Sequence, residues 1–183
     1  MKFKKKINKE LLIEFKQTHN PKELDEMLTR FEHDMNKKHL NYFLKESENP
    51  FIYFMEYSKP EELIRELEIR EEYNLTPVTC VISNMNYITS TILRKIRHKI
   101  SYNDTFKVNC HINSYTTPKA KNKIEQELTS KLEEIMRIEE DYKKPVWTIN
   151  VYIVGDITGI NIVSRKHNRT SFEISQAIEE ANL

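Results

Sequence analysis

Apolar and polar positions in the first half of the chain alternate between a strand pattern and a helix pattern. Residues 10–16 form an apolar stretch that predicts a short strand, and Pro21 opens a helix that extends to residue 38. The apolar positions of this helix recur at spacings of three and four residues, at Leu24, Met27, Leu28 and Phe31. Two further strands are predicted at residues 40–44 and 51–57, separated by a turn-like Glu-Asn-Pro.

A second helix and a fourth strand complete this half. Ser58 is a suitable N-cap for a helix that runs to about residue 73. Residues 77–82 are β-branched and apolar, and they predict a strand. The resulting order, βαββαβ, is that of a ferredoxin-like domain, with two helices on one face of a four-stranded antiparallel sheet. We therefore expect an α+β protein in which this N-terminal domain occupies residues 1–85 and a second α/β domain occupies residues 86–183.

The second half opens with a helix, at about residues 87–100, that is apolar on one face and cationic on the other. Its apolar stripe repeats every four residues, at Ile88, Ile92, Ile96 and Ile100. Arg94, Arg97 and His98 lie opposite this stripe, and Lys95 and Lys99 flank it. We expect the stripe to be buried and the cations to face solvent.

A strictly alternating segment follows at residues 105–114 and predicts a half-exposed strand. Its polar face carries Lys107, Asn109 and His111. Pro118 opens a helix to about residue 136, whose first turns carry Lys119, Lys121 and Lys123. Strands are predicted at residues 146–154 and 160–164, and a final helix at residues 171–182. Trp147 has apolar company along its strand, so we expect a core anchor and not a base-stacking platform.

The positive charge of the chain is concentrated in one stretch of sequence. Residues 94–123 hold eight Lys or Arg and one acid, a net of +7, although the whole chain carries only +1. Residues 1–85 have 14 basic and 16 acidic side chains, whereas residues 86–183 have 15 and 12. Local cationic surface is what a phosphate backbone binds, so the second half is the candidate for nucleic-acid binding. A second short basic cluster comprises Arg165, Lys166 and Arg169. The alternative to nucleic-acid binding is a lysine-rich surface that is simply solvated.

Several classes of chemistry have no support in the sequence. Two glycines in 183 residues leave no glycine-rich phosphate loop, and no spacing of His, Cys, Asp and Glu resembles a metal site. Cys80 and Cys110 fall in apolar segments and are expected to be small buried residues. Neither a membrane-spanning run nor a signal peptide is present in the sequence, so we expect a cytoplasmic protein without a cofactor.

Three segments of the second half carry a family pattern: Asp104 to Val108, Thr117-Pro118 at the start of the long helix, and residues 147–153 leading into the Gly155 to Ile160 segment. On these segments residues 86–170 resemble a THUMP domain, an RNA-binding module of tRNA-modifying proteins. The last of these segments is similar to the strand pair of the archaeal and eukaryotic THUMP adaptors that assist tRNA cytidine acetylation. One departure is that residues 111–115 stand where the family usually has a basic stretch with Arg and Gly.

The resemblance implies a non-catalytic adaptor that binds tRNA and presents it to a separate modification enzyme, for which a cytidine acetyltransferase is the named candidate. In many relatives the catalytic domain is fused, and because this sequence stops at Leu183 we expect the catalytic domain to belong to a separate protein. Two alternatives stay open: a protein-interaction or ligand-sensing module built on ferredoxin-like units, and an enzyme using carboxylates such as Glu133 and Glu134. Phosphate-driven binding falls steeply with ionic strength, which separates the adaptor from the interaction module.

Overall fold

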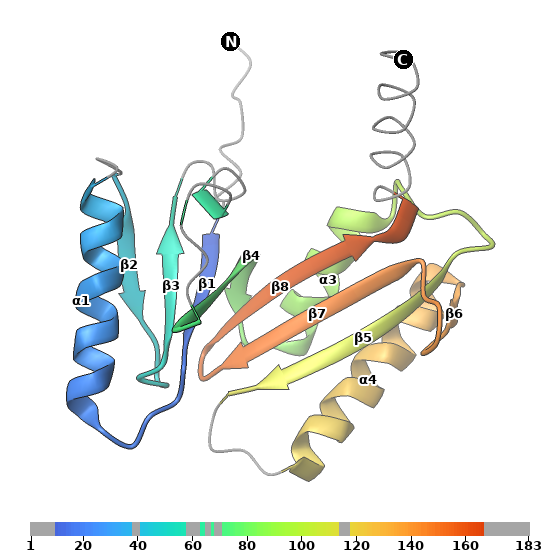
Figure 1. The fold of residues 1–183 in the computed structure, drawn as a ribbon. Helices are drawn as coiled ribbons and strands as arrows, with labels where there is room; N and C mark the ends of the chain where they lie inside the picture. The colour runs from blue at the N-terminus through green and yellow to red at the C-terminus, as the bar shows by residue number, and fades with distance from the viewer. Residues whose placement is uncertain are drawn as a thin grey trace, which may run out of the picture.

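The structure is a computed structural model that describes residues 10–37, 41–57, 63–64, 67, 71–113 and 118–166. The first half contains β1 (Glu10–Phe15), α1 (Pro21–Lys37), β2 (Phe43–Glu46), β3 (Ile52–Glu56) and β4 (Tyr73–Ile82). The second half contains α3 (Met85–Ile96), β5 (Thr105–Ile112), α4 (Pro118–Met136), β6 (Glu139–Glu140), β7 (Trp147–Val154) and β8 (Ile157–Ser164). The protein is therefore α+β, as the sequence predicts (Figure 1).

All eight strands belong to one mixed sheet in the order β2-β3-β1-β4-β8-β7-β5-β6. β5 is parallel to β6 and β7, whereas the other neighbours are antiparallel. β4 joins the two halves: its residues 73–78 pair with β1, and its residues 79–82 pair with β8. The predicted domain boundary at residue 85 thus follows a strand that is shared by both halves.

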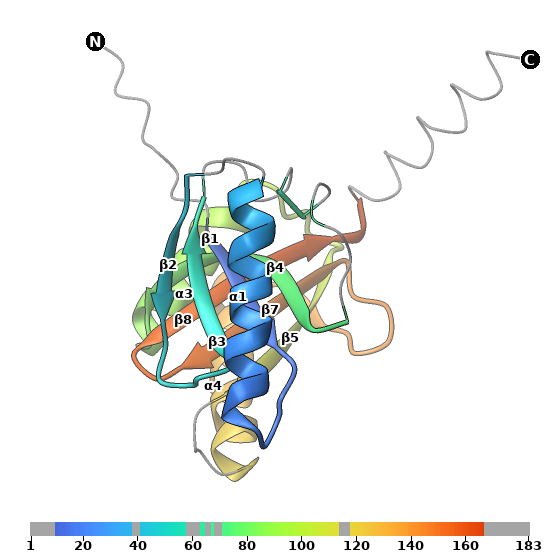
Figure 2. The same cartoon turned by 60° about the vertical axis from the view of Figure 1, so that its left-hand side comes forward.

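The described helices cover one face of this sheet. Tyr73 and Leu75 at the start of β4 pack in the cluster under α1, together with the buried Phe31. Val81 lies on the same face of the strand and packs against the cluster under α3 and α4. Figure 2 shows α1 crossing the face of β1 and β3, and Figure 1 shows α3 and α4 behind β5, β7 and β8.

A third cluster lies on the opposite face and holds the two halves together. Leu12 and Phe54 of the first half are buried there with Val154 at the end of β7. Polar contacts at the same junction include Asn49 Nδ2 donating to the Asn113 carbonyl (2.9 Å) and Asn113 Nδ2 donating to Glu14 Oε1 (3.2 Å). The sheet therefore bends around β4 toward the face that none of the described helices covers.

The structure corrects several predicted boundaries. β4 begins at Tyr73, four residues before the predicted start, because residues 73–76 pair with β1. α3 begins at Met85 because the Asn84 side chain accepts a hydrogen bond from the Asn86 amide and caps the helix. β8 starts at Ile157, directly after a tight turn in which Gly155 has a φ of 57°.

Two predicted helices lie mostly or wholly outside the described residues, and one observed strand was not predicted. Most of the helix predicted after Ser58 and all of the helix predicted at residues 171–182 lie outside the described residues. Four antiparallel strands in the order β2-β3-β1-β4 are present, but the second helix of the ferredoxin-like arrangement stays a prediction. The short strand β6 was not predicted, since two residues carry no periodic pattern.

Candidate nucleic-acid interface

The C-terminal end of α3 places a row of cations in solvent. Ile88, Ile92 and Ile96 are buried, which fixes the rotation of the helix. The basic side chains placed by this rotation are all exposed: Arg94, Lys95, Arg97, His98 and Lys99. The predicted division of this helix into an apolar and a cationic face is confirmed.

The charges in this row lie close enough to influence one another. Partial desolvation lowers the pKa of Lys95, and the neighbouring positive charges of Lys99 and Arg94 lower it further. Arg94 Nη2 donates to Thr91 Oγ1 at 3.0 Å, which holds its guanidinium near the helix. Because like charges repel here, a bound polyanion would relieve the repulsion.

The ends of α3 and α4 enclose a groove with a volume of about 490 Å³. Apolar side chains supply much of its lining: Leu93, Ile100, Ile135, Met136 and Ile138. Arg97 lines it from the α3 side, Arg137 from the α4 side, and Tyr102 from the loop after α3. Tyr102 is 88% exposed, so its ring is available to a ligand.

Arg137 reaches the groove through an unusual backbone conformation. Its φ is 54°, in the left-handed region that ends many helices and that usually holds glycine. Its amide still donates to the Glu133 carbonyl at 2.9 Å, as in a helix end. We define the cationic end as Arg94, Lys95, Arg97, His98, Lys99 and Arg137. Arg137 and Tyr102 were not predicted as site residues, because they lie outside the charged helix pattern. Only the tertiary fold brings them to the same groove as Arg97.

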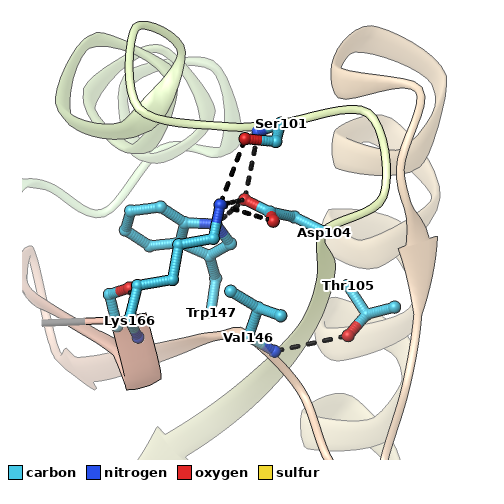
Figure 3. A network of polar contacts seen from close by, with 7 residues as sticks. Ser101, Asp104, Thr105, Val146, Trp147 and Lys166 are labelled. Carbon is cyan, nitrogen blue, oxygen red and sulfur yellow. Dashed lines mark hydrogen bonds and ion pairs between the residues drawn. The ribbon is translucent and has the colours of Figure 1, made fainter. Parts of the chain in front are cut away.

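Next to the cationic end, the buried carboxylate of Asp104 holds a polar network (Figure 3). Its Oδ2 accepts from Trp147 Nε1 at 2.8 Å and from the Ser101 amide at 3.0 Å. Lys166 Nζ lies 2.7 Å from Asp104 Oδ1 and also donates to Ser101 Oγ at 3.1 Å. Burial acts to raise the pKa of Asp104, but the hydrogen bonds from Lys166, Ser101 and Trp147 outweigh it, and the pKa lies below its ordinary value.

This network changes the interpretation of the second basic cluster. The Lys166 ammonium is held by a carboxylate that is only 5% exposed, so it stabilises the fold at this point. Trp147 is 4% exposed and is a core anchor, as predicted. Arg165 is exposed beside Lys166, and Arg169 lies outside the described residues.

The lysines at the start of α4 lie at the other end of the domain. Glu125 Oε2 accepts from the Cys110 amide at 2.8 Å, near the end of β5, whereas α4 leads into β6, which pairs with the start of β5. α4 therefore runs antiparallel to β5, which has eight residues and is roughly 23 Å long. Lys121 and Lys123 are exposed at this distant end, and the side chain of Lys119 is not among those described. The charge that is continuous in sequence is thus divided between two ends in space: Figure 1 shows the end of α3 and the start of α4 at opposite ends of the domain.

The polar face of β5 is largely occupied by contacts within the protein. Asn109 Nδ2 donates to Asn150 Oδ1 at 3.0 Å, in a chain of amides that continues across the sheet to β8 and β4. Lys107 Nζ lies 5.7 Å from the centre of the Tyr142 ring. His111 stacks on Tyr152 with ring centres 4.6 Å apart, and partial burial lowers the pKa of His111, opposed by Glu14. The lowered pKa of His111 favours the neutral imidazole on this face.

Within the part of the chain that the structure describes, His, Cys, Asp and Glu form no group of three or more able to hold a metal ion. The described helices include none that is long and apolar enough to cross a membrane.

Comparison with known proteins assigns part of the chain to a domain family. Residues 83–163, which include α3, the groove and the strands behind it, match the family model of the THUMP domain. This segment is a THUMP domain. A THUMP domain is an RNA-binding module, and its presence implies tRNA binding. No curated protein sequence matches the chain.

Two solved structures share the fold of the THUMP domain and the strands before it. PH1313 from Pyrococcus horikoshii Ot3 has a TM-score of 0.67 and 12% identity, covering 85% of this chain and 54% of that protein. A 4-thiouridine synthetase, solved as an RNA complex with bound ATP, has a TM-score of 0.54 and 15% identity, covering 86% of this chain and 42% of that protein. At such identities the similarity concerns the fold alone. The chain spans about half the length of these proteins or less.

Proposed function

We propose that this protein is a non-catalytic adaptor that binds tRNA through the cationic end and presents it to a separate modification enzyme. The observation that carries the proposal is that Arg97, Arg137 and the exposed Tyr102 line one groove of a THUMP domain, beside the other exposed basic residues at the end of α3. The cations supply charge for phosphates, and the ring and the apolar lining suit an unpaired base.

The cationic end is the better phosphate site of the two ends. It holds five residues on one helix end with Arg137 facing them across the groove, whereas Lys121 and Lys123 stand beside the carboxylates Glu125 and Glu127 on the same helix. Arginine also contacts phosphate with two parallel hydrogen bonds, which a lysine does not. We therefore assign the primary contact to the cationic end and a secondary one to the start of α4.

The chemistry of the described side chains supports an adaptor and not an enzyme. Burial raises the pKa of the Cys110 thiol to about 12 and raises that of Cys80 as well, so neither is a ready nucleophile. Glu133 and Glu134, considered above as an acid/base pair, are exposed on α4, in surroundings that suit solvated carboxylates.

The partner enzyme is proposed from the similarity of residues 147–160 to the adaptors of tRNA cytidine acetylation, which makes a cytidine acetyltransferase the first candidate. A role in tRNA modification implies a cytoplasmic protein. For residues 1–85 we propose a ferredoxin-like domain that acts as a spacer, supported by its strand order and its net charge of −2. Its attachment through β4 would set the distance between the bound tRNA end and the remainder of the tRNA.

The test combines a binding assay with an activity assay. We expect tRNA to bind with an affinity that falls by roughly 100-fold or more between 50 and 200 mM salt, as for a protein that neutralises several phosphates. We also expect no modified nucleotide in tRNA incubated with the pure protein and acetyl-CoA, S-adenosylmethionine or ATP, as judged by mass spectrometry. Binding without salt dependence would contradict the phosphate site, and a modified nucleotide would contradict the adaptor role.

A further inference from the structure

The groove between α3 and α4 leaves apolar surface uncovered in the described structure. Ile135 is 55% exposed, although it belongs to the apolar stripe of α4. It stands beside Met136 and opposite Leu93 and Ile100, and Arg97 and Arg137 contribute positive charge to the same groove. A surface of this kind suits a segment with an apolar stripe and acidic neighbours.

The end of β8 brings the chain to this groove. Lys166 is the last described residue, and its Nζ is held by Ser101 Oγ at 3.1 Å and by Asp104 Oδ1 at 2.7 Å (Figure 3). Ser101 itself lines the groove. The four residues 167–170 can span up to about 14 Å when extended, so residues from 171 onward start within reach of the groove.

The sequence after residue 170 has the complementary pattern. Ile174, Ala177, Ile178 and Ala181 recur at spacings of three and four residues, which gives one apolar stripe if the segment is helical. Residues 171–183 carry Glu173, Glu179 and Glu180 and contain no Lys or Arg, a net of −3. The groove offers arginines and an apolar lining, and the segment offers glutamates and an apolar stripe.

We propose that residues 171–183 dock in the groove between α3 and α4 of the same chain, with the Asp104–Lys166 contact as the anchor that directs them there. In this position Glu173 and Glu180, which flank the apolar stripe on a helix, face Arg97 and Arg137, and the segment competes with tRNA for these two arginines. The docking stands on the groove and the sequence pattern, whereas the competition rests on the proposed function.

Docking is tested in the full chain with pairs of engineered cysteines under mild oxidation at low protein concentration. The Ile135→Cys/Ile178→Cys pair joins the groove to the segment. The control pair, Glu127→Cys/Ile178→Cys, uses a position two turns away on the same helix, whose carboxylate is also solvent-exposed. Cys80 and Cys110 are not expected to compete, because burial raises the pKa of both thiols.

We expect the first pair to form an intrachain disulfide at least about tenfold more readily than the control, since a docked tail has a high local concentration at one site only. Mass spectrometry of the digested protein identifies the linked peptides. Equal yields for the two pairs, no disulfide, or a disulfide only between two molecules would overturn the proposal. This readout does not depend on RNA, so it is separate from the test of the proposed function.

The competition is tested with Ile174→Asp/Ile178→Asp, which removes the apolar stripe from the segment. A segment that occupies the groove about 70–90% of the time weakens tRNA binding roughly three- to tenfold, so this variant is expected to bind tRNA more tightly by that factor. The control Ser175→Asp/Gln176→Asp adds the same charge at positions outside the apolar stripe and should gain less. Unchanged or weaker tRNA binding by the isoleucine variant would overturn the competition.

Discussion

At the scale of single residues, Arg137 and Asp104 are the two side chains whose surroundings constrain them most clearly. Arg137 has a positive φ at the end of α4, where glycine would be free of steric cost. Asp104 is a buried carboxylate that holds Trp147, Ser101 and Lys166 at once. The first residue faces the proposed ligand and the second holds the adjoining loop in place, so their substitutions should have different effects.

Replacing Arg137 with glycine should separate binding from stability. Glycine relieves the cost of the left-handed conformation, about 1 kcal/mol, so the free energy of unfolding should stay the same or rise. tRNA affinity should fall by roughly tenfold, because one charged contact is lost. Chemical denaturation and tRNA titration of the same preparation measure both. Unchanged tRNA affinity would remove Arg137 from the site.

Replacing Asp104 with asparagine should reduce stability by about 2–3 kcal/mol, because Trp147 and Lys166 lose a charged acceptor. The pKa of Asp104 is lowered in the folded protein, so its contribution is fully present above its ordinary pKa of 3.8 and is lost as the pH falls through the lower folded value. The difference between wild type and variant should therefore shrink as the pH falls below about 4. Urea unfolding across pH measures it, with the exposed Asp156→Asn as a control that should change little. A difference that persists at low pH would contradict the assigned role.

At the scale of elements, periodic segments were predictable and tertiary pairing was not. The isoleucine stripe of α3 and the alternation of β5 predicted both elements and which of their side chains are buried. The extra residues of β4 gained strand structure only by pairing with β1, and β6 exists only because Glu139 and Glu140 reach the start of β5. The same limit applies to the candidate site. The exposure of the basic residues of α3 follows from helical spacing. The contributions of Arg137 and Tyr102, and the distance between Lys121 and the end of α3, depend on how the helices pack on the sheet.

The contact between β4 and β8 is close enough to test by overpacking. A Cβ added at Gly159 would lie 3.2 Å from Val78 Cγ1 and 3.3 Å from its Cβ. Gly159→Ala should therefore lower the free energy of unfolding by about 1–2 kcal/mol. Val78→Ala removes the crowding methyls, so the double variant should be less destabilised than the sum of the two single variants. Additive losses in thermal or urea unfolding would show that this contact is not tight.

At the scale of the whole molecule, β4 belongs to the sheet of both halves, so the second half depends on a strand that precedes residue 85. β8 needs β4 as its neighbour, and the third cluster mixes Leu12, Phe54 and Val78 with Val154. The division at residue 85 remains a prediction, and the sheet suggests that a cut before β4 keeps the second half more complete. The halves also differ in net charge, which agrees with the proposal that the second half binds RNA and the first half acts as a spacer.

Two fragments test this arrangement. Residues 73–183 retain β4, whereas residues 86–183 expose the edge of β8 and part of the third cluster. We expect the longer fragment to unfold at a higher temperature, by roughly 10 °C or more, since a loss of a few kcal/mol shifts the midpoint by that amount in a domain of this size. Circular dichroism melts measure the difference. Equal midpoints would mean that β4 belongs to the first half alone.

The central claim is that tRNA binds at the cationic end, and a matched pair of charge reversals tests it most directly. Arg97→Glu/Arg137→Glu changes the groove, and Lys121→Glu/Lys123→Glu makes the same change of charge at the start of α4; all four side chains are exposed. Circular dichroism first establishes that both variants are folded, and tRNA is then titrated at one fixed salt concentration. The groove variant should lose roughly 10- to 100-fold in affinity and the α4 variant less than about threefold. Equal losses, or a larger loss for the α4 variant, would contradict the assignment of the site.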